Sequence, residues 1–203
     1  MRKLQILVCI SLVAWFNGFT KTIDISNARI YTTITDKQVL LRSVEILQQE
    51  VKKRSQLEWS LISKFPPNNQ PVLGIALESD LSGFPAKVRD EIRKLPSIAS
   101  EGFKLLVLPE AKAVLIVGKD ARGILYGVGR LLRKMEMIPN QVLISDELTL
   151  ATSPRYPVRG HQLGYRPKTN AYDAFTVAQF DQYIRELALF GANSIEIVPP
   201  RTD

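Results

Sequence analysis

The chain has 203 residues, of which 45% are hydrophobic and 23% are charged, so its composition excludes a disordered or fibrous protein. Its formal net charge is +7, but lysine and arginine are spread along the chain. The single run, Lys52-Lys53-Arg54, ends a predicted helix, where cations interact favourably with the helix dipole. We therefore predict no nucleic-acid partner.

Residues 1–22 predict a secretory signal peptide. Arg2 and Lys3 supply a positive start, and the apolar run 4–16 is shorter than the ~20 residues that a membrane-spanning helix needs. The only cysteine, Cys9, lies in this run, so removal of the signal would leave neither a disulfide nor a thiol nucleophile. We expect an exported protein, periplasmic, at the cell surface or secreted, with no integral membrane span after signal removal.

Residues 23–150 predict a small α+β domain. Apolar runs bounded by turn residues predict six strands, at 28–34, 58–63, 72–77, 103–108, 113–117 and 142–144. Helical spacing of apolar residues predicts three helices: one opened by a capping box at 35–38, one at 86–94, and one capped by Asp120 and ended by Pro139-Asn140. This order predicts a sheet with its helices on one side.

Residues 151–203 predict a second unit, which follows a proline-containing boundary at 151–157. A strand at 158–163 precedes a helix with a capping box at 176–179, and a strand at 194–198 follows. The helix is expected to end at Gly191 and to bury one apolar face, formed by Val177, Phe180, Ile184 and Leu187. Such a parallel strand-helix-strand unit cannot bury both faces of its sheet by itself. We therefore expect the first part of an incomplete TIM-type barrel, and the α/β class for the whole chain.

Several polar side chains in this second unit are candidates for substrate binding, because barrel active sites lie at the carboxyl ends of the strands. Arginine and tyrosine donate well to sugar hydroxyls and carboxylates. The candidates from the two strands are Arg159, His161, Tyr165, Arg166 and Glu196. Three of them have a structural alternative: Arg159 as a paired arginine inside the barrel, His161 as a structural histidine, and Glu196 as half of a buried pair with an arginine.

No cofactor, metal or catalytic residue is predicted. His161 is the only histidine, so a zinc site built on a cluster of histidines is not expected. No Ser/His/Asp set can be argued from this single histidine either. Gly123, Gly127 and Gly129 fall within a predicted helix and do not follow the order of a dinucleotide-binding loop. The two carboxylates that glycoside cleavage requires cannot be picked out in this sequence.

Two stretches resemble a known family. Glu101-Gly102-Phe103, followed by a strand, a turn, a strand and then Asp120-Ala121-Arg122-Gly123 at the start of an amphipathic helix, resembles the accessory domain of glycoside hydrolase family 20, the β-N-acetylhexosaminidases. The same domain precedes the barrel of α-glucuronidases. Residues 154–160, which contain Arg159-Gly160, resemble the first barrel strand of family 20. The resemblance implies that Arg159 grips sugar hydroxyls, and that the catalytic acid, an Asp-Glu pair, belongs to a later strand.

These observations predict the amino-terminal part of an exported glycoside hydrolase that acts on O-glycosyl bonds of oligo- or polysaccharides and is hexosaminidase-like. The expected partner is a carbohydrate substrate. By itself the chain would be inactive if the acid lies beyond it. Two alternatives remain at this point: an α-glucuronidase-like glycosidase, and a non-catalytic exported module that binds a glycan or another partner.

Overall fold

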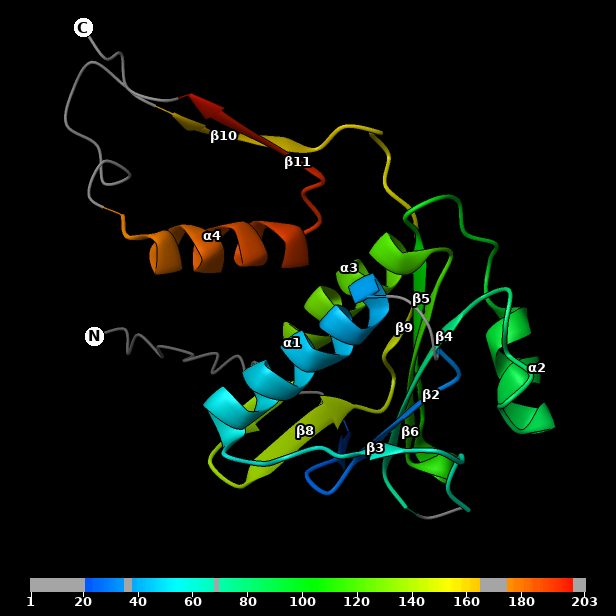
Figure 1. The fold of residues 1–203 in the computed structure, drawn as a ribbon. Coiled ribbons are helices and arrows are strands. Elements are labelled where there is room, and N and C mark those ends of the chain that lie inside the picture. The colour runs from blue at the N-terminus through cyan, green and yellow to red at the C-terminus, as the bar shows by residue number, and fades with distance from the viewer. Residues whose placement is uncertain (1–20, 35–37, 68–69, 165–174, 199–203) are drawn as a thin grey trace, which may run out of the picture.

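The structure is a computed structural model that describes residues 21–34, 38–67, 70–164 and 175–198 (Figure 1). Its four α-helices are α1 (Gln38–Ser55), α2 (Ala86–Lys94), α3 (Ala121–Leu132) and α4 (Val177–Leu189). Its strands are β1 (Thr22–Asp24), β2 (Arg29–Thr32), β3 (Leu61–Ile62), β4 (Val72–Leu77), β5 (Phe103–Leu108), β6 (Ala113–Gly118), β7 (Glu136–Ile138), β8 (Gln141–Ser145), β9 (Thr149–Thr152), β10 (Gly160–Gly164) and β11 (Ser194–Val198).

A mixed six-stranded sheet forms the centre of the α/β domain, in the order β3-β2-β4-β6-β5-β9. Strands β3, β2, β4 and β6 are parallel, whereas β5 pairs antiparallel with both β6 and β9. The predicted hairpin of β5 and β6 is confirmed, and its four-residue loop contains a 3-10 turn at Pro109–Ala111. Strands β1, β8 and β7 form a second, three-stranded antiparallel sheet.

Helices cover both faces of the six-stranded sheet, which corrects the expected one-sided arrangement. Side chains alternate along β4 and β6, so that Leu73 and Ile116 join one apolar cluster while Val72 and Leu115 join the other. Helices α1 and α3 pack on the first face, whereas Val88 and Ile92 bring α2 onto the second (Figure 1). The central strands β4 and β6 are apolar at every position, which is the pattern of strands buried on both faces. The one-sided expectation overlooked this signal.

Three short strands escaped the sequence prediction, and the end of one helix differs from it. Strands β1, β7 and β9 have three or four residues each, too few to show a period. Helix α3 ends at Leu132, so the expectation that Pro139-Asn140 ends it is wrong. These two residues instead connect β7 to β8, and Asn140 takes a left-handed backbone with φ 64°. Residues 1–20 of the expected signal peptide lie outside the described residues. Residues 35–37 of the first expected capping box lie outside them as well.

The second unit has the predicted parallel arrangement, β10–α4–β11. Thr176 and Gln179 form the expected capping box at the start of α4, and Gly191 follows its end with φ 101°, a left-handed backbone that glycine adopts without strain. Val177 is 81% exposed, so its expected burial is wrong, whereas Leu189 is buried. No helix among the described residues is long and apolar enough to cross a membrane.

Candidate functional site

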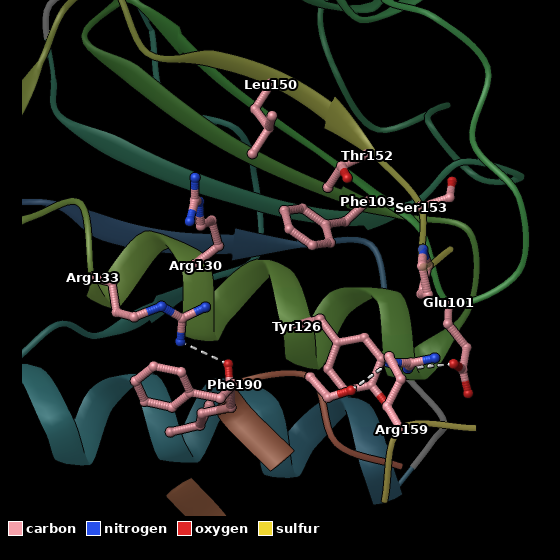
Figure 2. Close-up of a pocket in the computed structure, with 13 residues that line it drawn as sticks. Glu101, Phe103, Tyr126, Arg130, Arg133, Leu150, Thr152, Ser153, Arg159 and Phe190 are labelled. Carbon is pink, nitrogen blue, oxygen red and sulfur yellow. Dashed lines mark hydrogen bonds and ion pairs between the residues drawn. The ribbon is translucent and has the colours of Figure 1, made fainter. Parts of the chain in front are cut away.

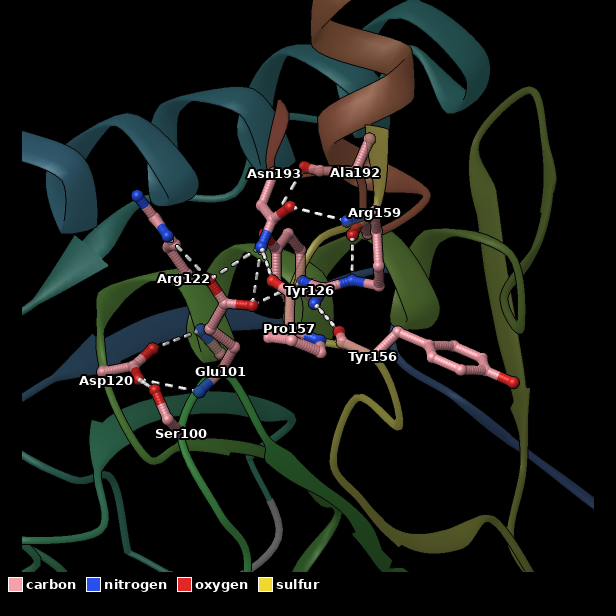
Figure 3. A network of polar contacts seen from close by, with 12 residues as sticks. Ser100, Glu101, Asp120, Arg122, Tyr126, Tyr156, Pro157, Arg159, Ala192 and Asn193 are labelled. Atoms are coloured by element: carbon pink, nitrogen blue, oxygen red, sulfur yellow. Dashed lines mark hydrogen bonds and ion pairs between the residues drawn. The ribbon is translucent and has the colours of Figure 1, made fainter. Parts of the chain in front are cut away.

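The candidate site lies where the α/β domain meets the β10–α4–β11 unit, and Asp120 shapes its base. One carboxylate oxygen of Asp120 accepts from the backbone N–H of Gly123 at 2.9 Å, which caps α3 as predicted. The other accepts from the backbone N–H of Glu101 at 2.8 Å and from Ser100 Oγ at 3.1 Å (Figure 3). These bonds hold Glu101 in a left-handed backbone with φ 61°, two residues before β5 begins.

The Glu101 carboxylate accepts hydrogen bonds from three other side chains (Figure 3). Arg159 Nη2 lies 2.6 Å from Oε2, Arg122 Nη1 lies 2.7 Å from Oε1, and Asn193 Nδ2 lies 3.2 and 3.3 Å from the two oxygens. Burial raises the pKa of Glu101, but the bonds from Arg122, Arg159 and Asn193 outweigh burial and lower the pKa to about 2. Glu101 is therefore ionised at neutral pH and cannot serve there as a general acid.

Each guanidinium nitrogen of Arg159 donates a hydrogen bond within this network. Besides Glu101, its guanidinium donates from Nε to the Gly191 carbonyl at 2.7 Å and from Nη1 to the Tyr156 carbonyl at 2.8 Å. The guanidinium carbon lies 5.3 Å from the centroid of the Tyr126 ring, within cation–π range. Arg159 is thus a paired arginine, but its partner Glu101 belongs to the α/β domain and not to the interior of a barrel. Sugar binding by Arg159 stays a prediction. Arg159 precedes the first residue of β10, so it lies at the amino end of that strand and not at the expected carboxyl end.

Asn193 ties the turn after α4 to the same network. Its Oδ1 accepts from the backbone N–H of Arg159 at 2.9 Å, while its Nδ2 also donates to the Pro157 carbonyl at 2.8 Å. Nearby, Tyr126 Oη donates to the Ala192 carbonyl at 3.4 Å. Side chains from the α/β domain therefore fix both the start of β10 and the turn between α4 and β11.

The other predicted site residues do not gather at this network. His161 Nε2 lies 3.0 Å from the hydroxyl of Tyr183 on α4, so its ring faces the helix. Glu196 pairs in register with Gln162, which follows His161 in β10. Because successive side chains of a strand alternate between faces, Glu196 lies on the sheet face opposite to His161. Glu196 is exposed in the described part of the chain, and its role as a sugar contact or as half of a buried pair with an arginine stays a prediction. Tyr165 and Arg166 lie outside the described residues.

A pocket of about 330 Å³ opens beside the network. Figure 2 shows Glu101 and Arg159 at one end of it and Arg130 and Arg133 at the other. Phe103 and Tyr126 line the space between, and Phe190 lies beside Arg133. The pocket depends on a close approach of two helices, because Gly129 of α3 lies so near α4 that an added Cβ would be 1.9 Å from the Leu189 carbonyl oxygen.

Sequence reasoning missed four residues of this site. Glu101 belonged to the resembling motif but received no role, and Asn193, Arg130 and Arg133 were not singled out. Glu101 is 58 residues from Arg159 and 92 from Asn193, so no local pattern signals their contact. Within the described ranges, no group of three or more histidine, cysteine, aspartate or glutamate residues is arranged to hold a metal ion.

No protein-family model matches the chain, and no curated protein sequence matches it. Solved structures match its fold. The GH20 β-N-acetylhexosaminidase from Streptomyces coelicolor A3(2) aligns with a TM-score of 0.61 at 18% identity, over 87% of this chain and 31% of that one. The GH20 exo-β-N-acetylglucosaminidase from Vibrio harveyi aligns with a TM-score of 0.57 at 16% identity, over 87% and 22%.

A GH115 4-O-methyl-α-glucuronidase is also similar, with a TM-score of 0.59 at 12% identity, over 87% of this chain and 26% of that one. The chain thus spans less than a third of the length of each of these three structures. Identities this low establish a shared fold and nothing finer. The resemblance to the family 20 accessory domain is therefore confirmed at the level of the fold, and this chain has the mixed α/β architecture found in those glycoside hydrolases.

Proposed function

We propose that this chain supplies the accessory domain and the first strand-helix-strand unit of a glycoside hydrolase that acts on O-glycosyl bonds and is hexosaminidase-like. One observation carries the proposal. A parallel β10–α4–β11 unit is fastened through Glu101, Arg159 and Asn193 to an α/β domain whose fold occurs in β-N-acetylhexosaminidases. A parallel two-stranded unit has little stability by itself, so a domain that holds it in place has a clear physical purpose.

The same geometry suggests where substrate contacts belong. In a barrel of alternating strands and helices, the chemistry takes place at the carboxyl ends of the strands. Strand β10 ends at Gly164, and Tyr165 and Arg166 follow it directly in the sequence. We assign substrate binding to these two residues first. Glu196 is a further candidate, since it lies on the sheet face away from α4. The role of Arg159 is then to position β10, whatever further contact it makes with a sugar.

The α-glucuronidase-like alternative has its own support. The GH115 4-O-methyl-α-glucuronidase shares the fold almost as closely as the family 20 enzymes do. An arginine such as Arg166 would suit the carboxylate of a sugar acid as well as the hydroxyls of a neutral sugar. We also propose export from the cell, on the strength of the charged start and short apolar run within residues 1–22.

The test is hydrolysis by the product of the complete reading frame that contains this chain. We expect cleavage of 4-nitrophenyl N-acetyl-β-glucosaminide and at least tenfold less cleavage of the β-glucoside, which lacks the acetamido group. Arg166→Ala should lower kcat/KM at least tenfold, at an unchanged melting temperature. Arg155→Ala is the matched control, since Arg155 is exposed. Cleavage of an α-glucuronide alone would favour the alternative. A folded protein that cleaves none of these substrates would contradict the proposal.

A further inference from the structure

The pocket beside the Glu101 network has a cationic end whose charge is not balanced. Arg130 lies in the last turn of α3 and lines this end. Its Nε is buried and has no hydrogen-bond partner. Among the residues that the structure describes, neither a hydrogen bond nor an ion pair involves the Arg130 side chain. A buried donor without a partner costs free energy, and a ligand that accepts from it would recover that cost.

Arg133 lies one turn further along and lines the same end of the pocket. Its Nη1 donates to the Leu189 carbonyl at 2.8 Å, and its guanidinium carbon is 4.3 Å from the centroid of the Phe190 ring. Burial lowers the pKa of Arg133, and the positive charge of Arg130 lowers it further. The two arginines therefore repel one another across a space that an anion would stabilise.

The acidic side chains near this space are engaged elsewhere or lie outside it. Glu101 lines the opposite end of the pocket and is bonded to Arg122 and Arg159. Glu50 and Glu186 line a neighbouring cavity that shares Arg133. Glu50 pairs there with Arg54 at 2.8 Å, and Glu186 accepts from Gln182 at 2.7 Å. No carboxylate among the lining residues described is left to neutralise Arg130.

The rest of the lining suits a ring that is apolar on its faces and polar at its edges. Phe103, Leu150 and Phe190 supply apolar surface, while Thr152 and Ser153 supply hydroxyl groups. The volume of about 330 Å³ falls within the range of small-molecule sites. Sugars present C–H faces that pack on aromatic rings and hydroxyl edges that exchange hydrogen bonds, and the arginine pair adds a requirement for negative charge.

We propose that this pocket binds a monosaccharide-sized carboxylate, a hexuronic acid in chemical class, whose carboxylate bridges Arg130 and Arg133. The site belongs to the junction at the amino end of β10, whereas the substrate contacts proposed above follow its carboxyl end. The proposal does not depend on glycoside hydrolysis, because it concerns binding alone. An acidic sugar held here would touch α3, β9 and α4 together and so would stabilise the junction between the two units.

The test is calorimetric titration of the full chain with glucuronate, glucose and acetate. Glucose has the ring without the carboxylate, and acetate has the carboxylate without the ring. We expect saturable binding of glucuronate and affinities at least tenfold lower for the other two. Arg130→Gln should weaken glucuronate binding about tenfold, because a charge-assisted contact is lost. Since the Arg130 side chain has no hydrogen bond or ion pair among the described residues, the melting temperature without ligand should stay the same or rise.

The control variant is Arg93→Gln, which changes an exposed arginine of α2 and should leave glucuronate binding unchanged. Equal affinities of wild type and Arg130→Gln for glucuronate would overturn the proposal. Equal binding of glucose and glucuronate would overturn it as well, because charge would then have no role. Equal binding of acetate and glucuronate would reduce the pocket to a general anion site and refute the sugar ring as part of the ligand.

Discussion

Glu101 joins three segments of the chain through one carboxylate, because Arg122, Arg159 and Asn193 all donate to it. We expect Glu101→Gln to lower the free energy of unfolding by about 2 kcal/mol, since bonds to a charged group are lost and two arginines stay behind without their anion. Urea denaturation measures the change. Glu110→Gln, at an exposed residue of the β5–β6 loop, is the control and should have no effect. Equal stability of Glu101→Gln and wild type would show that the network contributes nothing.

The same carboxylate predicts a dependence on pH. The folded pKa of Glu101 is about 2, below the ordinary value of 4.5, so the stabilising contribution is fully present above pH 4.5 and is lost as the pH falls toward 2. The difference in melting temperature between wild type and Glu101→Gln should therefore be constant from pH 7 to pH 5 and shrink below that. Melting curves across this range check the expectation. A difference that stays constant down to pH 3 would contradict it.

At the scale of elements, the contact between α3 and α4 depends on Gly129. An added Cβ would lie 1.9 Å from the Leu189 carbonyl oxygen, which is backbone and cannot rotate away. Gly129→Ala should therefore push the helices apart and destabilise the protein by about 2 kcal/mol, even though alanine is the better helix former. Thermal melting and hydrogen exchange in α4 measure this effect.

Gly160→Ala is the matched control for that substitution. The nearest atom to an added Cβ at Gly160 is Ser194 Cβ at 3.7 Å, an ordinary van der Waals distance. We therefore expect Gly160→Ala to leave both the melting temperature and the exchange of α4 unchanged. If Gly129→Ala were equally harmless, α3 and α4 would not be in the close contact described here.

At the scale of the whole molecule, burial is distributed unevenly. The α/β domain has two apolar clusters, whereas Leu189 is the single buried side chain among the residues described beyond 152. The β10–α4–β11 unit should accordingly open first, through the junction and not through the sheet. Native-state hydrogen exchange in low urea should show α4 amides exchanging before the fluorescence of buried Trp59 changes. Simultaneous loss of both signals would indicate a single cooperative unit instead.

Local sequence patterns predicted the candidate site only in part. Arg159 was singled out, and its paired-arginine alternative was considered, because the residue type and its place beside a strand are visible in the sequence. Its partner Glu101 could not be identified, since the two residues meet only after the β10–α4–β11 unit folds against the α/β domain. The unbalanced charge of Arg130 was equally hidden, because a lack of partners is a property of the folded surroundings and not of the residue.

The sequence by itself determined the elements that carry strong periodicity or a cap. Helix α2, strands β4, β5 and β11, the Asp120 cap and the Thr176–Gln179 capping box all follow from contacts within a few residues. The tertiary structure alone decided which sheet face each helix covers, where the shortest strands pair, and how Glu101 fastens the second unit to the first. Those outcomes depend on the packing of segments far apart in the chain. A local pattern can show that a surface is apolar or charged, but not which distant segment will contact it.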